Sequence, residues 1–101
     1  MGDMYIQCGD RRIADVQGYQ ARRGSDIMFY LILEKVYLTA EAIMDHLDLD
    51  HLGTFSFIVK KHDRIIRYDD CCLQATYNER GATIDKIWVN SYRRTEEAIP
   101  T

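Results

Sequence analysis

Residues 54–77 constrain the fold of this chain more than any other segment. Phe55, Phe57 and Val59 recur at every second position, which is the spacing of side chains on one face of a β-strand. The dipeptide His62-Asp63 then predicts a turn into a second strand that begins at Arg64. A strand, a tight turn and a strand form a scaffold, and no reactive motif lies on this one. We therefore expect the chain to build a shape or an assembly rather than to catalyse a reaction.

The segments before and after this unit predict more strands. Residues 4–7 and 13–19 flank a Cys-Gly-Asp turn at 8–10, which favours a β-hairpin. Residues 27–33 are almost continuously apolar, which indicates a strand buried on both faces. Residues 83–92 alternate with apolar side chains on both sides, so this strand is either central or covered by a neighbouring molecule.

One short helix is predicted between the apolar strand and the Phe-rich strand. Thr39 can cap it, Glu41 lies in its first turn, and Ala40, Ile43, Met44 and Leu47 recur at helical spacing, giving a helix over residues 40–47. The expected fold class is mainly β with one short α-helix (α+β), an antiparallel β-sandwich or barrel with a flanking helix. We expect a single domain over residues 1–101, with 93–101 as a charged tail that frays or reaches for a partner.

Composition narrows the classes of function. The net charge of −3 argues against a dedicated nucleic-acid binder, whose phosphate contacts need a strongly basic face. The first residues lack the pattern of a secretory signal, and no apolar run approaches the length that crosses a bilayer of about 30 Å, so we expect a soluble protein. Cys8, Cys71 and Cys72 are an odd set with two adjacent members, which favours reduced cytoplasmic thiols over a disulfide framework.

Residues 45–51 contain the densest cluster of metal-ligating residue types. An EF-hand loop starting at Asp48 would have Leu52 at its fifth position and Val59 where the bidentate Glu belongs, so this motif fails. The two histidines are five positions apart, without a His-Glu-x-x-His arrangement. We expect no metal and no cofactor. A small metal-dependent hydrolase is the least favoured alternative, and its candidate residues are His46, Asp48, Asp50 and His51.

Two adjacent pairs could in principle carry chemistry. Cys71 and Cys72 lack the spacing that brings two thiols to one centre, so buried small hydrophobes are the better interpretation. Asp69 and Asp70 are neighbours on a predicted strand and would point to opposite faces, whereas a general acid and base must converge. Because no nucleophile elbow, phosphate loop or paired-thiol metal signature is present either, we predict that the chain is not an enzyme and has no catalytic residues.

The order of these elements resembles the tail-tube proteins of phages and related prophage elements. The features that carry the resemblance are the N-terminal hairpin, a strand, the short helix, the Phe-rich strand 54–60, the strand through Tyr68-Asp-Asp-Cys-Cys, and a final strand with a charged tail. The resemblance implies two packed antiparallel sheets with a flanking helix, in rings of six subunits that form a DNA-conducting tube. The chain departs from the family in having no room for a long loop between residues 23 and 27. A tube initiator, terminator or baseplate-proximal ring protein is therefore an equal alternative to a main tube protein.

The resemblance predicts a virion tail protein assembled in the host cytoplasm. Its partners would be further copies of itself in a ring, expected to be hexameric, other tail or baseplate proteins, and DNA that passes through the lumen without specific binding. A monomeric β-sandwich adaptor that binds a protein through its Tyr and Trp surface is the alternative from another class. The candidate subunit interface comprises Met28, Tyr30, Ile32, Ile58, Lys60, Trp88, Tyr92, Arg93 and Arg94.

Overall fold

The computed structural model describes residues 3–22, 24, 27–46, 54–77 and 84–99. Within these ranges the chain forms seven strands and one short helix, so a mainly β fold with a single short helix is confirmed. In chain order the elements are β1 (Met4–Cys8), β2 (Arg11–Ala21), β3 (Met28–Tyr37), α1 (Ala40–His46), β4 (Thr54–Lys60), β5 (Arg64–Tyr77), β6 (Ile84–Asn90) and β7 (Arg93–Ala98).

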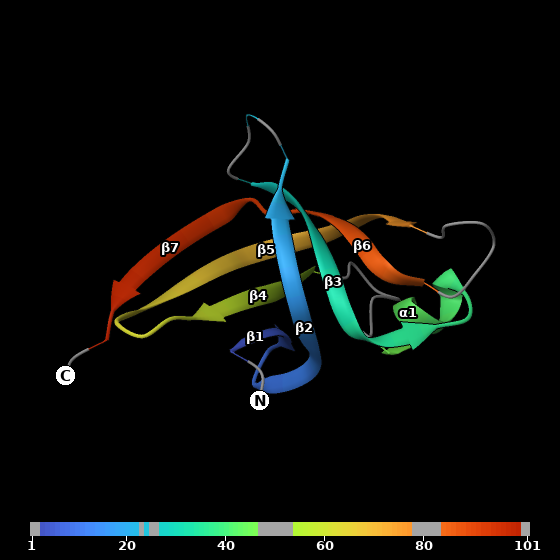
Figure 1. The fold of residues 1–101 in the computed structure, drawn as a ribbon, viewed down its shortest axis with the longest axis horizontal. Coiled ribbons are helices and arrows are strands. Elements are labelled where there is room, and N and C mark those ends of the chain that lie inside the picture. Colours follow the sequence, from blue (N-terminus) through green and yellow to red (C-terminus); the bar gives the residue numbers. More distant parts are fainter. Residues whose placement is uncertain (1–2, 23, 25–26, 47–53, 78–83, 100–101) are drawn as a thin grey trace.

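Six of the strands close into an antiparallel barrel. Their hydrogen-bonded order is β4-β1-β2-β3-β6-β5, and pairing of β4 with β5 closes the ring. Strand β7 lies outside this closure, next to the first half of β5 (Figure 1). Of the two predicted architectures the strands adopt the barrel, because β5 is long enough to pair with β4 along one edge and with both β7 and β6 along the other.

Two predicted turns set the register of the hairpins. Gly9 has a φ of 60° between β1 and β2, in the left-handed region that glycine enters without steric cost. Between β4 and β5, the Lys61 amide donates to the Arg64 carbonyl at 2.8 Å, so the predicted turn around His62 is confirmed. Both connections are short, and they therefore place consecutive strands side by side.

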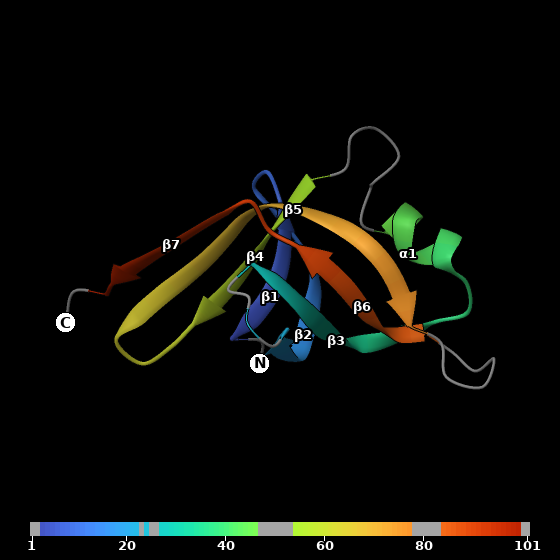
Figure 2. The same cartoon turned by 90° about the horizontal axis from the view of Figure 1, so that it is seen from above.

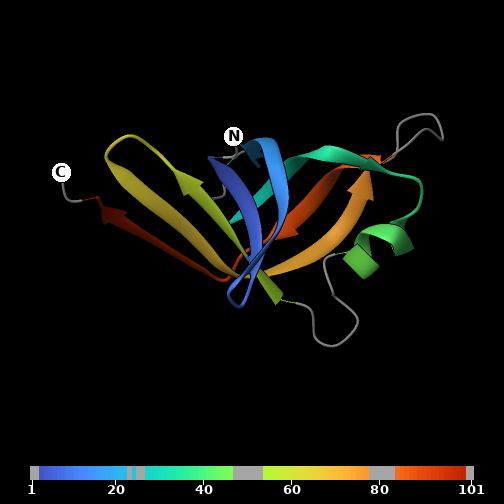
Figure 3. The same ribbon diagram turned by 90° about the horizontal axis from the view of Figure 1, so that it is seen from below.

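The helix begins where its capping residue predicts. The hydroxyl oxygen of Thr39 accepts a hydrogen bond from the Ala42 amide at 3.1 Å, which satisfies one of the amides left free at a helix start. Ile43 is fully buried and joins the barrel core, whereas Met44 is partly exposed. The last predicted helical residue, Leu47, lies outside the described residues. Helix α1 and strand β7 lie at opposite ends of the longest axis (Figures 2 and 3).

The barrel interior holds one apolar cluster built from every strand of the barrel and from α1. Its centre is aromatic: the Phe57 ring lies 5.3 Å from Tyr19, 5.5 Å from Phe29 and 5.7 Å from Tyr68, measured between centroids. Phe55, Phe57 and Val59 are all buried on one face of β4, as predicted. Removal of this apolar surface from water contributes most of the free energy that stabilises the barrel.

The prediction that the strand at residues 27–33 is buried on both faces is wrong. In β3, Phe29, Leu31 and Leu33 are buried in the core, but Met28, Tyr30 and Ile32 are only half-buried on the outer side. The apolar run reflects a barrel strand whose outer face is also apolar, not a strand between two layers. The outer side chains of β3 are therefore available for contacts.

The prediction that Ile58 faces a partner is wrong for the free chain. Ile58 lies on the outer face of β4 but is 1% exposed. Tyr5 is directly opposite it on β1, and Arg67 is directly opposite it on β5. These larger neighbours lie on both sides of Ile58, which removes it from the accessible surface.

Residues 93–101 were predicted to fray or to reach for a partner, and the first of these alternatives is wrong for Arg93–Ala98. Arg93–Ala98 form strand β7, which pairs with β5 without a register shift from Asp69↔Arg93 to Arg64↔Ala98. The charged composition suggested a solvated tail, but a strand can be exposed on both faces when its backbone is paired along one edge. All six residues of β7 are exposed.

Candidate interaction surfaces

The outer side of β3 and β6 carries an aromatic face, by which we mean Met28, Tyr30, Ile32 and Trp88. Tyr30 and Trp88 are directly opposite in the β3–β6 pairing, and their ring centroids are 3.8 Å apart. The alternation of the two strands places both rings outside while Leu31 and Ile87 fill the core. Four of the predicted interface residues are thus gathered on one surface.

Cationic side chains border this aromatic face. The Lys86 ammonium lies 4.4 Å from the centroid of the Tyr30 ring, and the Arg22 guanidinium lies 5.7 Å from that of Trp88. Both distances are within the range in which a cation is attracted to the negative face of an aromatic ring. Aromatic rings combined with Arg are characteristic of protein–protein contact surfaces.

A shallow groove with a volume of about 260 Å³ runs beside the two rings. It is lined by Tyr30 and Trp88 together with Ala75 and Thr76 from β5, and most of its lining is apolar. The small side chains of β5 leave this space next to the large rings of β3 and β6. An extended peptide or the edge of another protein could use such a groove.

A bulge in β5 separates the aromatic face from β7. Opposite the single residue Ser56, β5 has the two residues Asp69 and Asp70, because Phe55 pairs with Cys71 while Phe57 pairs with Tyr68. Asp70 has a φ of 54°, a left-handed conformation that aspartate tolerates better than most residues. At this point β5 changes its neighbour from β7 to β6.

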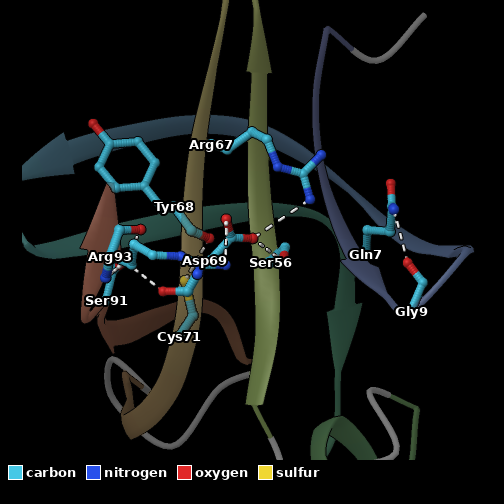
Figure 4. A network of polar contacts seen from close by, with 9 residues as sticks. All are labelled: Gln7, Gly9, Ser56, Arg67, Tyr68, Asp69, Cys71, Ser91 and Arg93. Atoms are coloured by element: carbon cyan, nitrogen blue, oxygen red, sulfur yellow. Dashed lines mark hydrogen bonds and ion pairs between the residues drawn. The ribbon is translucent and has the colours of Figure 1, made fainter. Parts of the chain in front are cut away.

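Asp69 is the centre of a polar network at the bulge (Figure 4). Its carboxylate accepts a hydrogen bond from the Ser56 hydroxyl at 2.6 Å and lies 3.4 Å from the Arg67 and 3.5 Å from the Arg93 guanidinium. Burial alone would raise the pKa of Asp69, but the Ser56 hydrogen bond and the two guanidinium groups outweigh it and hold the pKa below its ordinary value. The network links β4, β5 and β7 through one ionised group.

Ser91, in the connection between β6 and β7, attaches that connection to the bulge of β5. It is fully buried, and its hydroxyl donates to the Asp69 carbonyl at 2.8 Å while accepting from the Arg93 amide at 3.4 Å.

Next to Ser91, burial raises the pKa of the Cys71 thiol to about 12. Cys71 is therefore a protonated core residue and not a nucleophile at neutral pH. This agrees with its prediction as a buried hydrophobe, whereas Cys72 is only half-buried.

Strand β7 carries charged side chains on both faces. The Glu96 carboxylate forms one ion pair with the Arg64 guanidinium of β5, at 3.1 Å, and another with the Arg94 guanidinium, at 3.6 Å. The Arg94 guanidinium also lies 5.6 Å from the Tyr68 ring centroid. In both ion pairs the two partners are at least one-third exposed, so the pairs stabilise the strand weakly.

The remaining predicted interface residues are separate from the aromatic face. Lys60 is exposed at the end of β4, with its ammonium 5.6 Å from the Tyr5 ring. Tyr92 is 65% exposed just before β7, where Arg93 and Arg94 begin the strand. With Ile58 buried, the structure divides the rest of the predicted interface into the aromatic face, the start of β7 and Lys60 at the end of β4.

The candidate metal cluster is mostly outside the described residues, since Asp48, Asp50 and His51 all lie there. The remaining member, His46, ends α1 with its Nε2 atom 3.0 Å from the Ile13 carbonyl and its ring 5.7 Å from that of Tyr37. Within the described ranges no three His, Cys, Asp or Glu residues are grouped closely enough to hold a metal ion. The same ranges contain no helix with the length and apolar character needed to cross a membrane.

Sequence reasoning missed the network around Asp69. The expectation that Asp69 and Asp70 point to opposite faces assumed regular alternation, which the bulge interrupts, and the two differ in burial, since Asp69 is buried and Asp70 is exposed. The signal that could have indicated the bulge is the adjacent pair of aspartates between Tyr68 and Cys71, which interrupts the alternation of the strand. Its partners, Ser56 and Ser91, are far from it in the sequence and carry no signal of their own.

Comparison with known proteins adds no relative: no protein-family model, no curated protein and no solved structure matches the chain.

Proposed function

We propose that this chain is a non-enzymatic virion structural protein that self-assembles into rings of a phage tail tube or of its baseplate or terminator end. The observation that carries the proposal is the aromatic face, where Tyr30 and Trp88 pack edge-to-face on the outside of a closed barrel. A barrel with a filled core does not need large rings on its outer surface for stability. Such rings are the residue types that carry most of the binding energy in protein interfaces.

A ring of identical subunits needs two different contact surfaces on each subunit, because its interface is heterologous. The aromatic face supplies one, with cations at its border and a groove beside it. A surface elsewhere on the neighbouring subunit would supply the other. The net charge of −3 suits a lumen through which DNA moves without being held.

The test is the mass of the purified chain by light scattering, together with negative-stain images. We expect rings for the natural sequence and their loss in Trp88→Ala, which removes the largest ring of the aromatic face. Leu38→Ala is the matched control, since Leu38 is 81% exposed and lies next to α1, away from that face. Absence of rings at every protein concentration, and in the presence of other tail proteins, would rule the proposal out.

A second candidate is a monomeric adaptor that binds an extended segment of another protein. The groove between the two rings and β5 favours it, because aromatic-lined grooves accept extended peptides. The two proposals predict different particle masses in solution. The adaptor has the mass of a single chain and retains a partner through the groove. Ala75 is exposed and directly opposite Trp88, so Ala75→Arg would fill the groove with a long side chain, and it should abolish that partner binding while leaving the fold intact.

A further inference from the structure

Strand β7 presents a sheet edge at one end of the molecule (Figures 1 and 2). Its inner edge pairs with β5, and the ladder continues to the Ile99 amide, which donates to the Asp63 carbonyl at 2.8 Å. Among the described strands none pairs with its outer edge. A sheet edge of this kind is a template for another strand.

The register of β7 on β5 determines which backbone groups face outward. In an antiparallel pair, opposed residues alternate between those that exchange both hydrogen bonds and those that exchange none. The Ile99–Asp63 bond sets this phase, so residues 95, 97 and 99 bond toward β5. The backbone amides and carbonyls of Arg94, Glu96 and Ala98 therefore point away from β5.

The charges of β7 are self-complementary in an antiparallel alignment. The strand reads Arg93-Arg94-Thr95-Glu96-Glu97, with two cations, a neutral residue and two anions. If two copies pair antiparallel about Thr95, each Arg94 lies opposite the Glu96 of the second copy, and each Arg93 lies opposite its Glu97. Opposite charges directly across a ladder are favourable, and this alignment provides each of these pairs twice.

Backbone and charge favour the same alignment. Pairing about Thr95 brings together Arg94 and Glu96, two of the residues whose backbone groups point outward, as hydrogen-bonded pairs. The adjacent two-fold alignments are centred on Arg94 or on Glu96, and each would place two like charges directly opposite one another. Charges on an edge strand usually prevent association. Here the order of signs excludes the neighbouring registers and leaves one favourable.

We propose that β7 pairs antiparallel with β7 of a second copy of this chain, about a two-fold axis through Thr95, and so joins two barrels by a continuous sheet. This contact is isologous and closes on itself as a dimer. It goes beyond the ring proposal, because it needs only β7 and leaves the aromatic face uncovered. In a ring-forming protein it would join subunits of two rings.

The first test removes one outward amide. Proline at an edge is tolerated where its nitrogen faces solvent, so Glu96→Pro keeps the ladder to β5 and blocks the ladder to a second copy. By sedimentation at low salt, we expect the natural chain to associate in pairs through β7, as single subunits or as rings, and Glu96→Pro to associate at least about tenfold more weakly, since backbone hydrogen bonds on both sides of the axis are lost. Glu96→Ala is the matched control: it keeps the amide and should weaken the dimer less. Circular dichroism establishes that each variant is folded.

Two outcomes would overturn this proposal. One is a natural chain that sediments as a monomer at all concentrations, and the other is a Glu96→Pro variant that dimerises as well as Glu96→Ala. The ring proposal is tested separately in the Trp88→Ala background. A dimer that persists there and is split by Glu96→Pro supports β7 pairing whether or not rings form, whereas rings without such a dimer would overturn β7 pairing alone.

The second test exchanges the charges. Arg94→Glu should weaken its own dimer roughly tenfold, because Glu would then lie opposite Glu on both sides of the axis, and Glu96→Arg should do the same with Arg opposite Arg. An equal mixture of the two variants restores both opposite-charge pairs and should form a heterodimer. High salt should weaken the natural dimer and the mixed dimer alike. A mixture that stays monomeric would contradict the register centred on Thr95.

Discussion

The two halves of β5 have the same antiparallel backbone pairing but very different surroundings. In the second half β5 pairs with β6, whose Ile87 and Val89 are fully buried in the core. In the first half it pairs with β7, where every residue is exposed. Backbone ladders of the same kind thus hold β6 as a strand of the barrel wall and β7 as a strand outside the barrel.

The difference shows what a ladder alone can do. Backbone hydrogen bonds replace bonds to water and contribute only modestly to stability, whereas burial of apolar side chains contributes far more. The barrel is held by its aromatic core, and β7 is held by its ladder together with the contacts of Asp69 and Ser91. We therefore expect β7 to open before the barrel does.

The largest effect is expected in the barrel core. Phe57→Ala removes a fully buried ring that contacts three other aromatic rings, and should lower the free energy of unfolding by about 3–5 kcal/mol. Urea unfolding followed by circular dichroism measures this loss. Leu38→Ala is the exposed control and should stay within about 0.5 kcal/mol of the natural chain. A small loss for Phe57→Ala would mean that the aromatic core does not stabilise the barrel more than the backbone ladder stabilises β7.

An intermediate effect is expected at the junction. Asp69→Asn keeps the shape of the side chain but removes the charge that faces Arg67 and Arg93, and should cost about 1–3 kcal/mol. Hydrogen exchange should accelerate more in β7 than in β6. Asp70→Asn is the matched control, because Asp70 is exposed and asparagine tolerates its left-handed backbone. Equal acceleration in both strands would contradict a separate attachment of β7.

Asp69 also makes the free energy of unfolding depend on pH, in a direction that its pKa determines. The folded-state pKa of Asp69 lies below the ordinary value of 3.8, so the folded chain binds fewer protons than the unfolded chain in that range. The stabilisation is fully present above the unfolded pKa and is lost as the pH falls from about 3.8 through the lower folded pKa. Asp69→Asn should lack this part of the acid sensitivity. The difference between the two unfolding curves isolates it from the other carboxylates.

The sequence predicted the parts of this fold that depend on local patterns. The alternation of Phe55, Phe57 and Val59, the glycine turn at Gly9 and the cap at Thr39 each use residues close in the chain, and all three are confirmed. Barrel closure was only one of two expected architectures. It depends on the length of β5 and on its bulge, which side-chain periodicity does not reveal.

The errors have one physical origin, which is the environment supplied by distant strands. The burial of Ile58 depends on Tyr5 and Arg67 from two other strands, and the order of residues 93–98 depends on an edge of β5 that local composition does not show. For the candidate surfaces, the predicted interface included both Tyr30 and Trp88, although the apolar run at residues 27–33 did not distinguish the two faces of that strand. Their direct pairing required the register between β3 and β6.

The smallest effect is expected among the surface ion pairs of β7. Glu96→Gln keeps the size of the side chain and removes its attraction to Arg64 and Arg94, and in dilute protein it should change the free energy of unfolding by less than about 1 kcal/mol. The reason is that the partners are well exposed and water screens the charges. Glu97→Gln on the opposite face is the control, and salt should reduce any difference between the two. A loss as large as that of Asp69→Asn would show that side-chain ion pairs, rather than the backbone ladder and the junction at Asp69, hold β7 in place.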